Sequence, residues 1–303
     1  MKLDTIVKNT GLEASRRFAA PSLWASKRWQ GRLSLTLTYA LLLFFGALVT
    51  LPFLWMLSTS LKQMDDIFLF PPKWIPDPIV WSNYPRALSK VPFLLFFKNT
   101  FIITFFAIIG TLVSASLVAY SFARLRWPGR DVCFFIVLTT LMLPHQVTLI
   151  PQFIIFRELN WIDTLLPLIV PWFFGGGAFN IFLLRQFFIT IPEELDDAAR
   201  IDGCSYLGIY ARIIIPMSRP VLAAVAIFAF QNHWNEFLLP LIYIHSRSRY
   251  TLALGLRLFQ EQYWVDWSGL MAASTVVMLP VLLVFYFAQR YFIQGIVFTG
   301  VKG

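Results

Sequence analysis

Six long apolar runs dominate the pattern of hydrophobic and polar positions along the chain. They lie at residues 35–61, 97–123, 132–156, 165–188, 221–243 and 270–292. A helix of about 20 residues crosses a hydrocarbon core of about 30 Å, so each run is long enough to span a membrane. Lipid requires the backbone to satisfy its own hydrogen bonds, and no run shows the short alternating pattern of barrel strands. The pattern therefore predicts an all-α integral membrane protein with six transmembrane helices.

One polar segment, DDAARIDGCSYLGIYARIIIPMSRP at residues 196–220, interrupts this apolar chain. Its first half has acids before an Ala-Ala pair and follows Pro192, as at a helix start, and Gly203 is placed to end that helix. In its second half, apolar residues recur at amphipathic spacing before Pro216 and Pro220: Tyr206, Ile209, Tyr210, Ile213 and Ile214. The pattern predicts a helix, a glycine turn and a second helix. A knob that docks on a partner and a helix lying on lipid headgroups are both open at this point.

Basic residues indicate which ends face the cytoplasm. The first 34 residues carry Lys2, Lys8, Arg16, Arg17, Lys27, Arg28 and Arg32, and the following run is long enough to span and lacks a small-residue cleavage site. We expect an uncleaved first helix with this tail in the cytoplasm. Six crossings then put Arg124, Arg126, Arg130, the polar segment and the C-terminus on the same side. Several segments assigned outside also hold basic residues, including Arg247, Arg249 and Arg257.

Composition narrows the class of protein. Hydrophobic residues make up 58% of the 303 residues and charged residues 14%, which excludes a water-soluble globule. The net charge of +9 fits membrane topology and anionic lipid, because the chain has no basic soluble domain for nucleic acid. Cys133 and Cys204 are expected in reduced surroundings. The histidines, His145, His233 and His245, lack a second ligand at metal-binding spacing, so we expect no metal site.

Motifs for chemistry on the chain itself are absent from the sequence. It contains no G-x-x-x-x-G-K-[ST], H-E-x-x-H or G-x-S-x-G. The triplet Gly175–Gly177 lies within an apolar run with no following lysine, so we interpret it as close helix packing or a kink. We expect a protein that moves a solute, without enzymatic activity and without a cofactor of its own.

The polar segment also resembles a known signature. Asp197-Ala198-Ala199, then Gly203, then Ile213, Ile215 and Pro216, at these spacings, is similar to the EAA---G---------I-LP loop of the membrane subunits of binding-protein-dependent ABC importers. Asp197 replaces the family's Glu and Ile215 its Leu. The resemblance continues through FNIFLLRQFF, IPEELDDAARIDG with Glu194, WNEFLLPL and FIQGIVFTGVKG, and it points to the carbohydrate type, related to the smaller membrane subunit of the maltose importer.

This resemblance implies a type I ABC importer permease fold in a bacterial inner membrane. It implies three kinds of partner: a homologous second permease, two ATPase subunits that bind the ATP, and an extracytoplasmic solute-binding protein. The loop at 190–219 would dock in a cleft of the ATPase. We divide the chain into a tail (1–34), the first helix with its outer segment (35–96), the transporter domain (97–292) and a C-terminal tail (293–303).

A second polar group lies in the fifth run, at QNHWNEF. It contains Gln231, Asn232, His233, Trp234, Asn235 and Glu236. Such residues are costly in lipid, so they should face protein or water. One interpretation is a wall of the route for a hydroxyl-rich solute, with Trp234 stacking on a sugar; the other, which we favour, is hydrogen bonding to a neighbouring helix or subunit. In the second run, Ala107, Thr111, Ala115, Ala119 and Ala123 form a small-residue stripe that indicates close helix contact.

Two other classes of protein remain as alternatives. A stand-alone secondary transporter should have midplane carboxylates or discontinuous helices in both halves, and acids are nearly absent from the centres of these runs. A membrane-embedded hydrolase should have a nucleophile and base pair. The sequence leaves the solute open among a mono- or oligosaccharide, a polyol and a glycerol phosphate.

Overall fold

The computed structural model describes residues 27–260 and 264–300, and it divides at residue 58 into two units. The first unit holds nearly all of helix α2 (Lys27–Ser60). This helix runs unbroken through Pro52 and is long and apolar enough to cross a membrane over Gly31–Ser60. The predicted basic tail, 1–34, lies mostly outside the described residues.

The second unit is built from helices in its described part, with one isolated antiparallel bridge between Gln260 and Val265. After α2 the elements are η2 (Met64–Asp66), α3 (Asn83–Lys90), α4 (Phe93–Arg124), α5 (Arg130–Thr139), η3 (Thr140–Met142), α6 (His145–Glu158), α7 (Leu166–Ile169), η4 (Val170–Phe173), α8 (Ala178–Ile189), α9 (Glu194–Ile201), α10 (Tyr206–Ile209), η5 (Tyr210–Ile214), α11 (Ile215–Met217), α12 (Arg219–Trp234), α13 (Leu238–Tyr243), η6 (Arg247–Arg249), α14 (Leu252–Leu256), η7 (Arg257–Phe259) and α15 (Trp267–Gly300).

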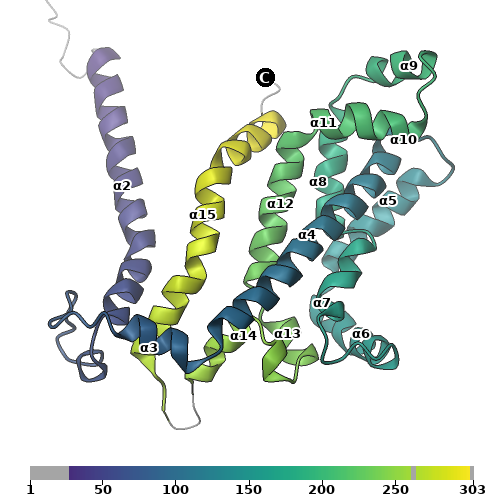
Figure 1. Ribbon diagram of the computed structural model, residues 1–303. Helices are drawn as coiled ribbons and strands as arrows, with labels where there is room; N and C mark the ends of the chain where they lie inside the picture. Colours follow the sequence, from purple (N-terminus) through teal and green to yellow (C-terminus); the bar gives the residue numbers. More distant parts are fainter. Residues whose placement is uncertain (1–26, 261–263, 301–303) are drawn as a thin grey trace, which may run out of the picture. The chain divides into compact units, whose positions relative to one another are not determined.

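Helix α4 is the central element of this unit (Figure 1). It packs against α8, α12 and η4, and α12 packs in turn against α15. Residues of α4 take part in all three apolar cores. Ala107, Thr111, Ala115 and Ala119 are buried along it, because small side chains let neighbouring helices approach closely. The prediction that this stripe makes helix contacts is confirmed.

Three of the predicted continuous helices are broken in the structure, two of them at prolines. The third run bends by 101° at Pro144, with α5 and η3 on one side of the bend and α6 on the other. Proline lacks an N–H and holds the preceding residue in extended backbone, so a helix ends before it. The fifth run ends at Trp234 instead of Tyr243, and α13 follows separately. Pro240 cannot donate to the carbonyl of Glu236, which accounts for this second break.

The glycine triplet interrupts the fourth run instead of lying inside a continuous helix. Gly175, Gly176 and Gly177 have φ angles of +100°, +64° and +91° and join η4 to α8. A Cβ on Gly176 would lie 2.6 Å from the carbonyl oxygen of Thr111 on α4. The interpretation as a kink and a close helix approach is confirmed.

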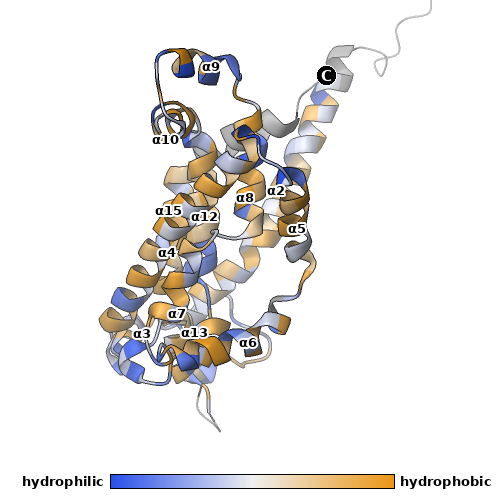
Figure 2. Ribbon diagram, turned by 90° about the vertical axis from the view of Figure 1, so that its right-hand side faces the viewer, coloured by the Kyte–Doolittle hydropathy of each residue, from blue (hydrophilic) through white to orange (hydrophobic). Residues whose placement is uncertain are grey.

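Helices suited to a membrane account for most of the chain. Among the described residues, four helices are long and apolar enough to span, and two bent pairs bring the number to six if each is one span. Figure 2 shows the apolar residues along these helices and hydrophilic residues gathered at α9. Helices α9, α10 and α11 lie at one end of the second unit, and α3, α13 and α14 lie at the other (Figure 1).

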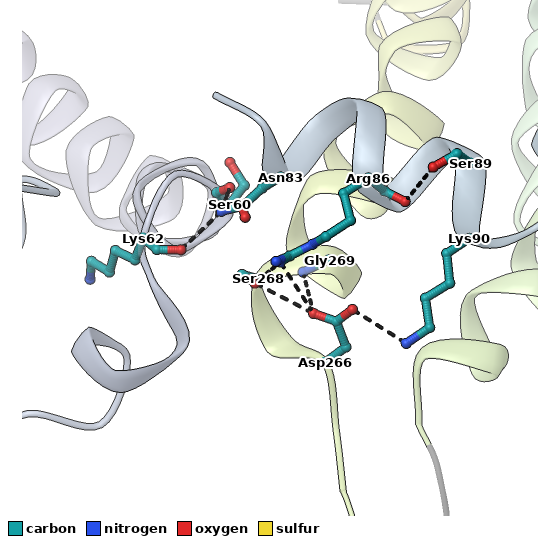
Figure 3. A network of polar contacts seen from close by, with 9 residues as sticks. All are labelled: Ser60, Lys62, Asn83, Arg86, Ser89, Lys90, Asp266, Ser268 and Gly269. Carbon is teal, nitrogen blue, oxygen red and sulfur yellow. Dashed lines mark hydrogen bonds and ion pairs between the residues drawn. The ribbon is translucent and has the colours of Figure 1, made fainter. Parts of the chain in front are cut away.

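A polar network at the end opposite α9 ties α3 to the start of α15 (Figure 3). Asp266 is buried and accepts a hydrogen bond from the Gly269 N–H at 2.9 Å, which caps α15. Its carboxylate lies 3.3 Å from Lys90 Nζ and 3.8 Å from an Arg86 guanidinium nitrogen. This end of the unit is therefore held by charge as well as by apolar packing.

Candidate functional site

The polar segment forms the predicted helix, glycine turn and helix. Helix α9 carries Glu194, Asp196 and Asp197 in its first turn, where the helix dipole favours acids. Gly203 ends it with φ +79°. The Gly203 N–H donates to the Arg200 carbonyl at 3.0 Å, and the Cys204 N–H donates to the Ala199 carbonyl at 2.9 Å. This pair of hydrogen bonds is the Schellman motif, which commonly ends a helix at a glycine. We call residues 190–219 the coupling loop from here on.

The second half of the coupling loop differs from one regular amphipathic helix. Ser205 caps α10 by accepting from the Gly208 N–H at 3.2 Å, and a π-helical turn, η5, then separates α10 from α11. Pro216 lacks the N–H that would bond to the Arg212 carbonyl, and a widened turn accommodates its ring. Ile209 and Ile214 are fully buried as predicted, whereas Tyr206 is exposed instead of lying on the apolar face.

The residues of the signature lie at different depths. Ala199 is buried, and Ile213 and Ile215 are half-buried. Exposed positions are Glu194, Asp197, Ala198, Gly203 and Pro216. The Asp197 carboxylate lies 3.1 Å from Arg200 on the same exposed helix face. It therefore remains accessible to a partner.

Asp196 and Arg124 form a buried pair at the base of the loop that the sequence did not reveal. Arg124, at the end of α4, donates to the carbonyls of Phe188 at 2.7 Å and Ile191 at 2.6 Å. Its other terminal nitrogen lies 3.7 Å from Asp196, and the two side chains are 2% and 5% exposed. Burial raises the pKa of Asp196, while the Arg124 charge opposes that rise. Asp196 and Ala199 share the buried face of α9, a spacing visible in the sequence, but the partner on α4 is not.

An apolar tip stands out on the exposed side of the loop. It consists of Ile201 and Leu207, which are 87% and 67% exposed on either side of the glycine turn. Acids flank it at Asp197 and Asp202. These exposed apolar side chains are available to contact another protein.

The QNHWNEF segment divides into packed and accessible residues. Trp234 is 2% exposed, donates its indole N–H to the Val277 carbonyl at 3.1 Å, and packs against Phe97 and Phe230. The alternative that Trp234 stacks on a sugar does not hold for this buried ring. Its hydrogen bond joins α12 to α15 within the chain.

Three of the remaining polar residues of this segment border a small cavity. Asn235 bonds back to the Gln231 carbonyl at 2.9 Å, and Glu236 accepts from the Leu239 N–H at 3.1 Å and so caps α13. Asn232, His233 and Glu236 line a cavity of about 200 Å³. Trp172, which the sequence analysis did not single out, also lines it and meets the His233 ring edge to face at 4.5 Å. Among the described residues, no group of three or more His, Cys, Asp or Glu side chains is placed to hold a metal.

Comparison with known proteins decides the family. Residues 112–297, which include the whole coupling loop and the cavity segment, match the family described as "Binding-protein-dependent transport system inner membrane component". The chain belongs to this family.

Relatives across most of the chain agree with this membership. The "Arabinooligosaccharides transport system permease protein AraQ" of Bacillus subtilis (strain 168) is 33% identical over 276 residues, covering 90% of this chain and 96% of that protein. The "Diacetylchitobiose uptake system permease protein DasC" of Streptomyces coelicolor is 31% identical, covering 87% and 95%. The "Probable ABC transporter permease protein YurM" of Bacillus subtilis is 32% identical, covering 88% and 89%.

The fold is that of a solved importer. A chain of the bacterial ABC transporter "involved in the import of the acidic polysaccharide alginate" superposes with a TM-score of 0.76 at 24% identity, over 88% of this chain and 98% of that one. The protein is thus a multi-pass membrane subunit of a binding-protein-dependent ABC importer. The alternative of a stand-alone secondary transporter is wrong, and the prediction of a type I permease fold is confirmed.

Proposed function

We propose that this permease forms half of the translocation pathway for a sugar or related polyhydroxylated solute. The carbohydrates in the names of its relatives support that solute class. In this proposal a homologous second permease supplies the other half, two ATP-binding subunits supply the energy, and an extracytoplasmic binding protein delivers the solute. The chain itself performs no enzymatic reaction and holds no cofactor, because ATP is bound by the partner ATPase.

The observation that carries the proposal is the geometry of the coupling loop. A helix resting on anionic headgroups needs positive charge beside its apolar face. Residues 193–202, in and beside α9, hold five acids, Glu193, Glu194, Asp196, Asp197 and Asp202, and one base, Arg200. Asp196 is paired with Arg124 and Glu193 with Arg126, which leaves Glu194, Asp197 and Asp202 as exposed acids. This charge opposes lipid binding and favours a basic protein cleft. Glu194, Asp197 and the apolar tip would then contact the ATPase, while Ala198, Ala199, Ile213, Ile215 and Pro216 shape the loop.

Orientation and domain boundaries follow from this placement. With the coupling loop in the cytoplasm of a bacterial cell, six crossings put both termini on the cytoplasmic side of the inner membrane. The long segment between α2 and α4 then faces outside. The proposed divisions remain 1–34, 35–96, 97–292 and 293–303.

For the QNHWNEF segment at the end of α12 we propose that some residues line the pathway and others hold the helices together. Asn232 and Glu236 border the cavity and would line part of the route of a hydroxyl-rich solute, whereas Trp234 joins α12 to α15 and Asn235 bonds back to the end of α12. Gln231 is exposed on a membrane helix, where its amide is expected to meet the neighbouring subunit.

Co-expression with the products of adjoining genes tests the proposed function. The tagged chain should purify with an ATPase and a second permease, and the complex should hydrolyse ATP, while the chain alone should not. The binding protein's thermal midpoint should rise with arabino-oligosaccharides or diacetylchitobiose if the solute class is right. Solute uptake by the chain alone, without an ATPase, would contradict the proposal.

A further inference from the structure

Helix α4 carries three polar side chains at four-residue intervals, Ser116, Tyr120 and Arg124, and all three are buried. This spacing places them on one face of the helix. We call them the polar ladder. The end of α4 that bears them lies beside α10 (Figure 1).

Each residue of the ladder contacts a different part of the coupling loop. The Ser116 and Tyr210 hydroxyls are 2.7 Å apart, and the Tyr120 hydroxyl donates to the Tyr206 carbonyl at 3.0 Å. The Arg124 guanidinium meets Asp196. The loop therefore runs antiparallel to α4, with α9 at the helix end and η5 two turns further in.

Further contacts strengthen the seam, by which we mean the line of contact between the polar ladder and the coupling loop. Arg124 also holds the Phe188 and Ile191 carbonyls at the end of α8, so it joins three segments at the base of the loop. The Tyr120 and Tyr210 rings lie 5.4 Å apart between centroids. Ile209 and Ile214, fully buried, add apolar packing around the polar contacts.

Hydrogen bonds weaken steeply when they are misaligned, so these contacts resist sliding of the loop along α4. Apolar packing alone resists such sliding less well. The hydrogen bonds are also stronger in a buried, low-dielectric seam than in water. We propose that the polar ladder is the rigid link through which the coupling loop moves α4 as one body when the ATPase closes. Since α4 packs against α12, the movement reaches the helix that bears Asn232. The inference rests on the proposed function.

A distance measurement that needs no solute tests the ladder. Spin labels are placed at Ala211→Cys on the loop and Leu94→Cys at the far end of α4, both exposed positions, in a Cys133→Ser, Cys204→Ser background. The complete importer in nanodiscs is measured without nucleotide and after trapping with ATP and vanadate. Because loop and helix move together, the label distance should stay the same between the two states.

The ladder variant Ser116→Ala, Tyr120→Phe, Arg124→Gln should retain the ATPase but show a distance shift of about 5 Å on trapping, the size of a one-turn slip of one element past another. The milder pair Tyr120→Phe, Tyr210→Phe, which removes only hydroxyls, should show a smaller shift in the same direction. A control variant carries the same three kinds of substitution at exposed positions outside the loop, Ser89→Ala, Arg157→Gln and Tyr286→Phe, and should behave like the unmodified chain.

Two results would overturn the inference: a distance that changes on trapping in the unmodified chain, or one that stays constant in both ladder variants. Co-purification of the ATPase reports separately on the proposed function. A failure of one idea is thereby distinguishable from a failure of the other.

Discussion

Single residues at the end opposite the coupling loop show how charge fixes the loops of this permease. Asp163 has φ +60° and accepts from the His245 and Ser246 N–H groups at 3.0 and 2.8 Å. Its carboxylate also meets Ser246 Oγ and lies 3.1 Å from Arg249. These contacts join the loop before α7 to the loop after α13. They also place a basic residue of this end, Arg249, in an ion pair.

The Asp163 contacts predict a specific acid sensitivity. Hydrogen bonds from Ser246 lower the pKa of Asp163 from 3.8 to about 2. A lowered pKa means that the ionised form stabilises the fold above about pH 4 and that this stabilisation is lost as pH falls toward 2. Asp163→Asn keeps a residue that tolerates positive φ but removes the charge. It should lower the thermal midpoint at pH 7 by about 2–4 °C.

Thermal unfolding of the purified permease in detergent measures this effect. Asp131→Asn, an exposed aspartate paired only with its neighbour Arg130 in the described structure, serves as the control. An unchanged midpoint for Asp163→Asn at pH 7 would mean that the loops before α7 and after α13 are held by other contacts.

At the scale of elements, the close approach of α4 and the glycine triplet leaves no room for a side chain at one of the three glycines. A Cβ on Gly176 would meet the Thr111 carbonyl, Ala115 Cβ and Ser114 Oγ at 2.6, 2.9 and 2.9 Å, whereas one on Gly175 would meet nothing within 4 Å. Both glycines have positive φ, so both alanine variants bear backbone strain. Only Gly176→Ala adds a clash with α4.

We therefore expect Gly176→Ala to destabilise the permease by roughly 1–3 kcal/mol more than Gly175→Ala, the usual cost of overpacking. Chemical unfolding followed by tryptophan fluorescence compares the two variants. Equal losses would show that the helices separate easily at this point.

Which elements the sequence could predict depends on the range of the interactions involved. The coupling loop was predictable because Gly203, the acids of α9 and the spacing of Ile209 and Ile214 act within a few residues. The breaks at Pro144 and Pro240 were missed because both prolines lie within apolar runs, where hydropathy alone favours a continuous span. The Asp196 and Arg124 pair and the Trp172 and His233 contact join residues far apart in the chain, so no local pattern reveals them.

At the scale of the whole molecule, the membrane topology determines on which side of the membrane the termini and the coupling loop lie. The basic tail and Arg124, Arg126 and Arg130 predict a cytoplasmic location for both termini. In a chain with Cys133→Ser and Cys204→Ser, a membrane-impermeant thiol reagent added to spheroplasts should miss Ser15→Cys and Thr299→Cys and reach Asp77→Cys. Labelling of either terminal position would overturn the orientation, and with it the cytoplasmic position of the coupling loop.

The central claim is that the coupling loop docks on an ATPase, and it depends on the turn and on an acidic residue. Gly203 has positive φ with open space around it, so Gly203→Val strains the turn without a clash. Asp197→Lys reverses the exposed charge. Gly129→Val and Asp131→Lys are matched controls, because Gly129 also has positive φ and open surroundings and Asp131 is also exposed.

The most direct measurement is the amount of ATPase that co-purifies with the tagged permease from detergent, relative to the second permease. Gly203→Val and Asp197→Lys should reduce it about tenfold or more, which corresponds to about 1.4 kcal/mol of binding free energy. Asp197→Glu and both controls should leave it near the unmodified level. Full retention of the ATPase by both Gly203→Val and Asp197→Lys would contradict a docking role for the loop.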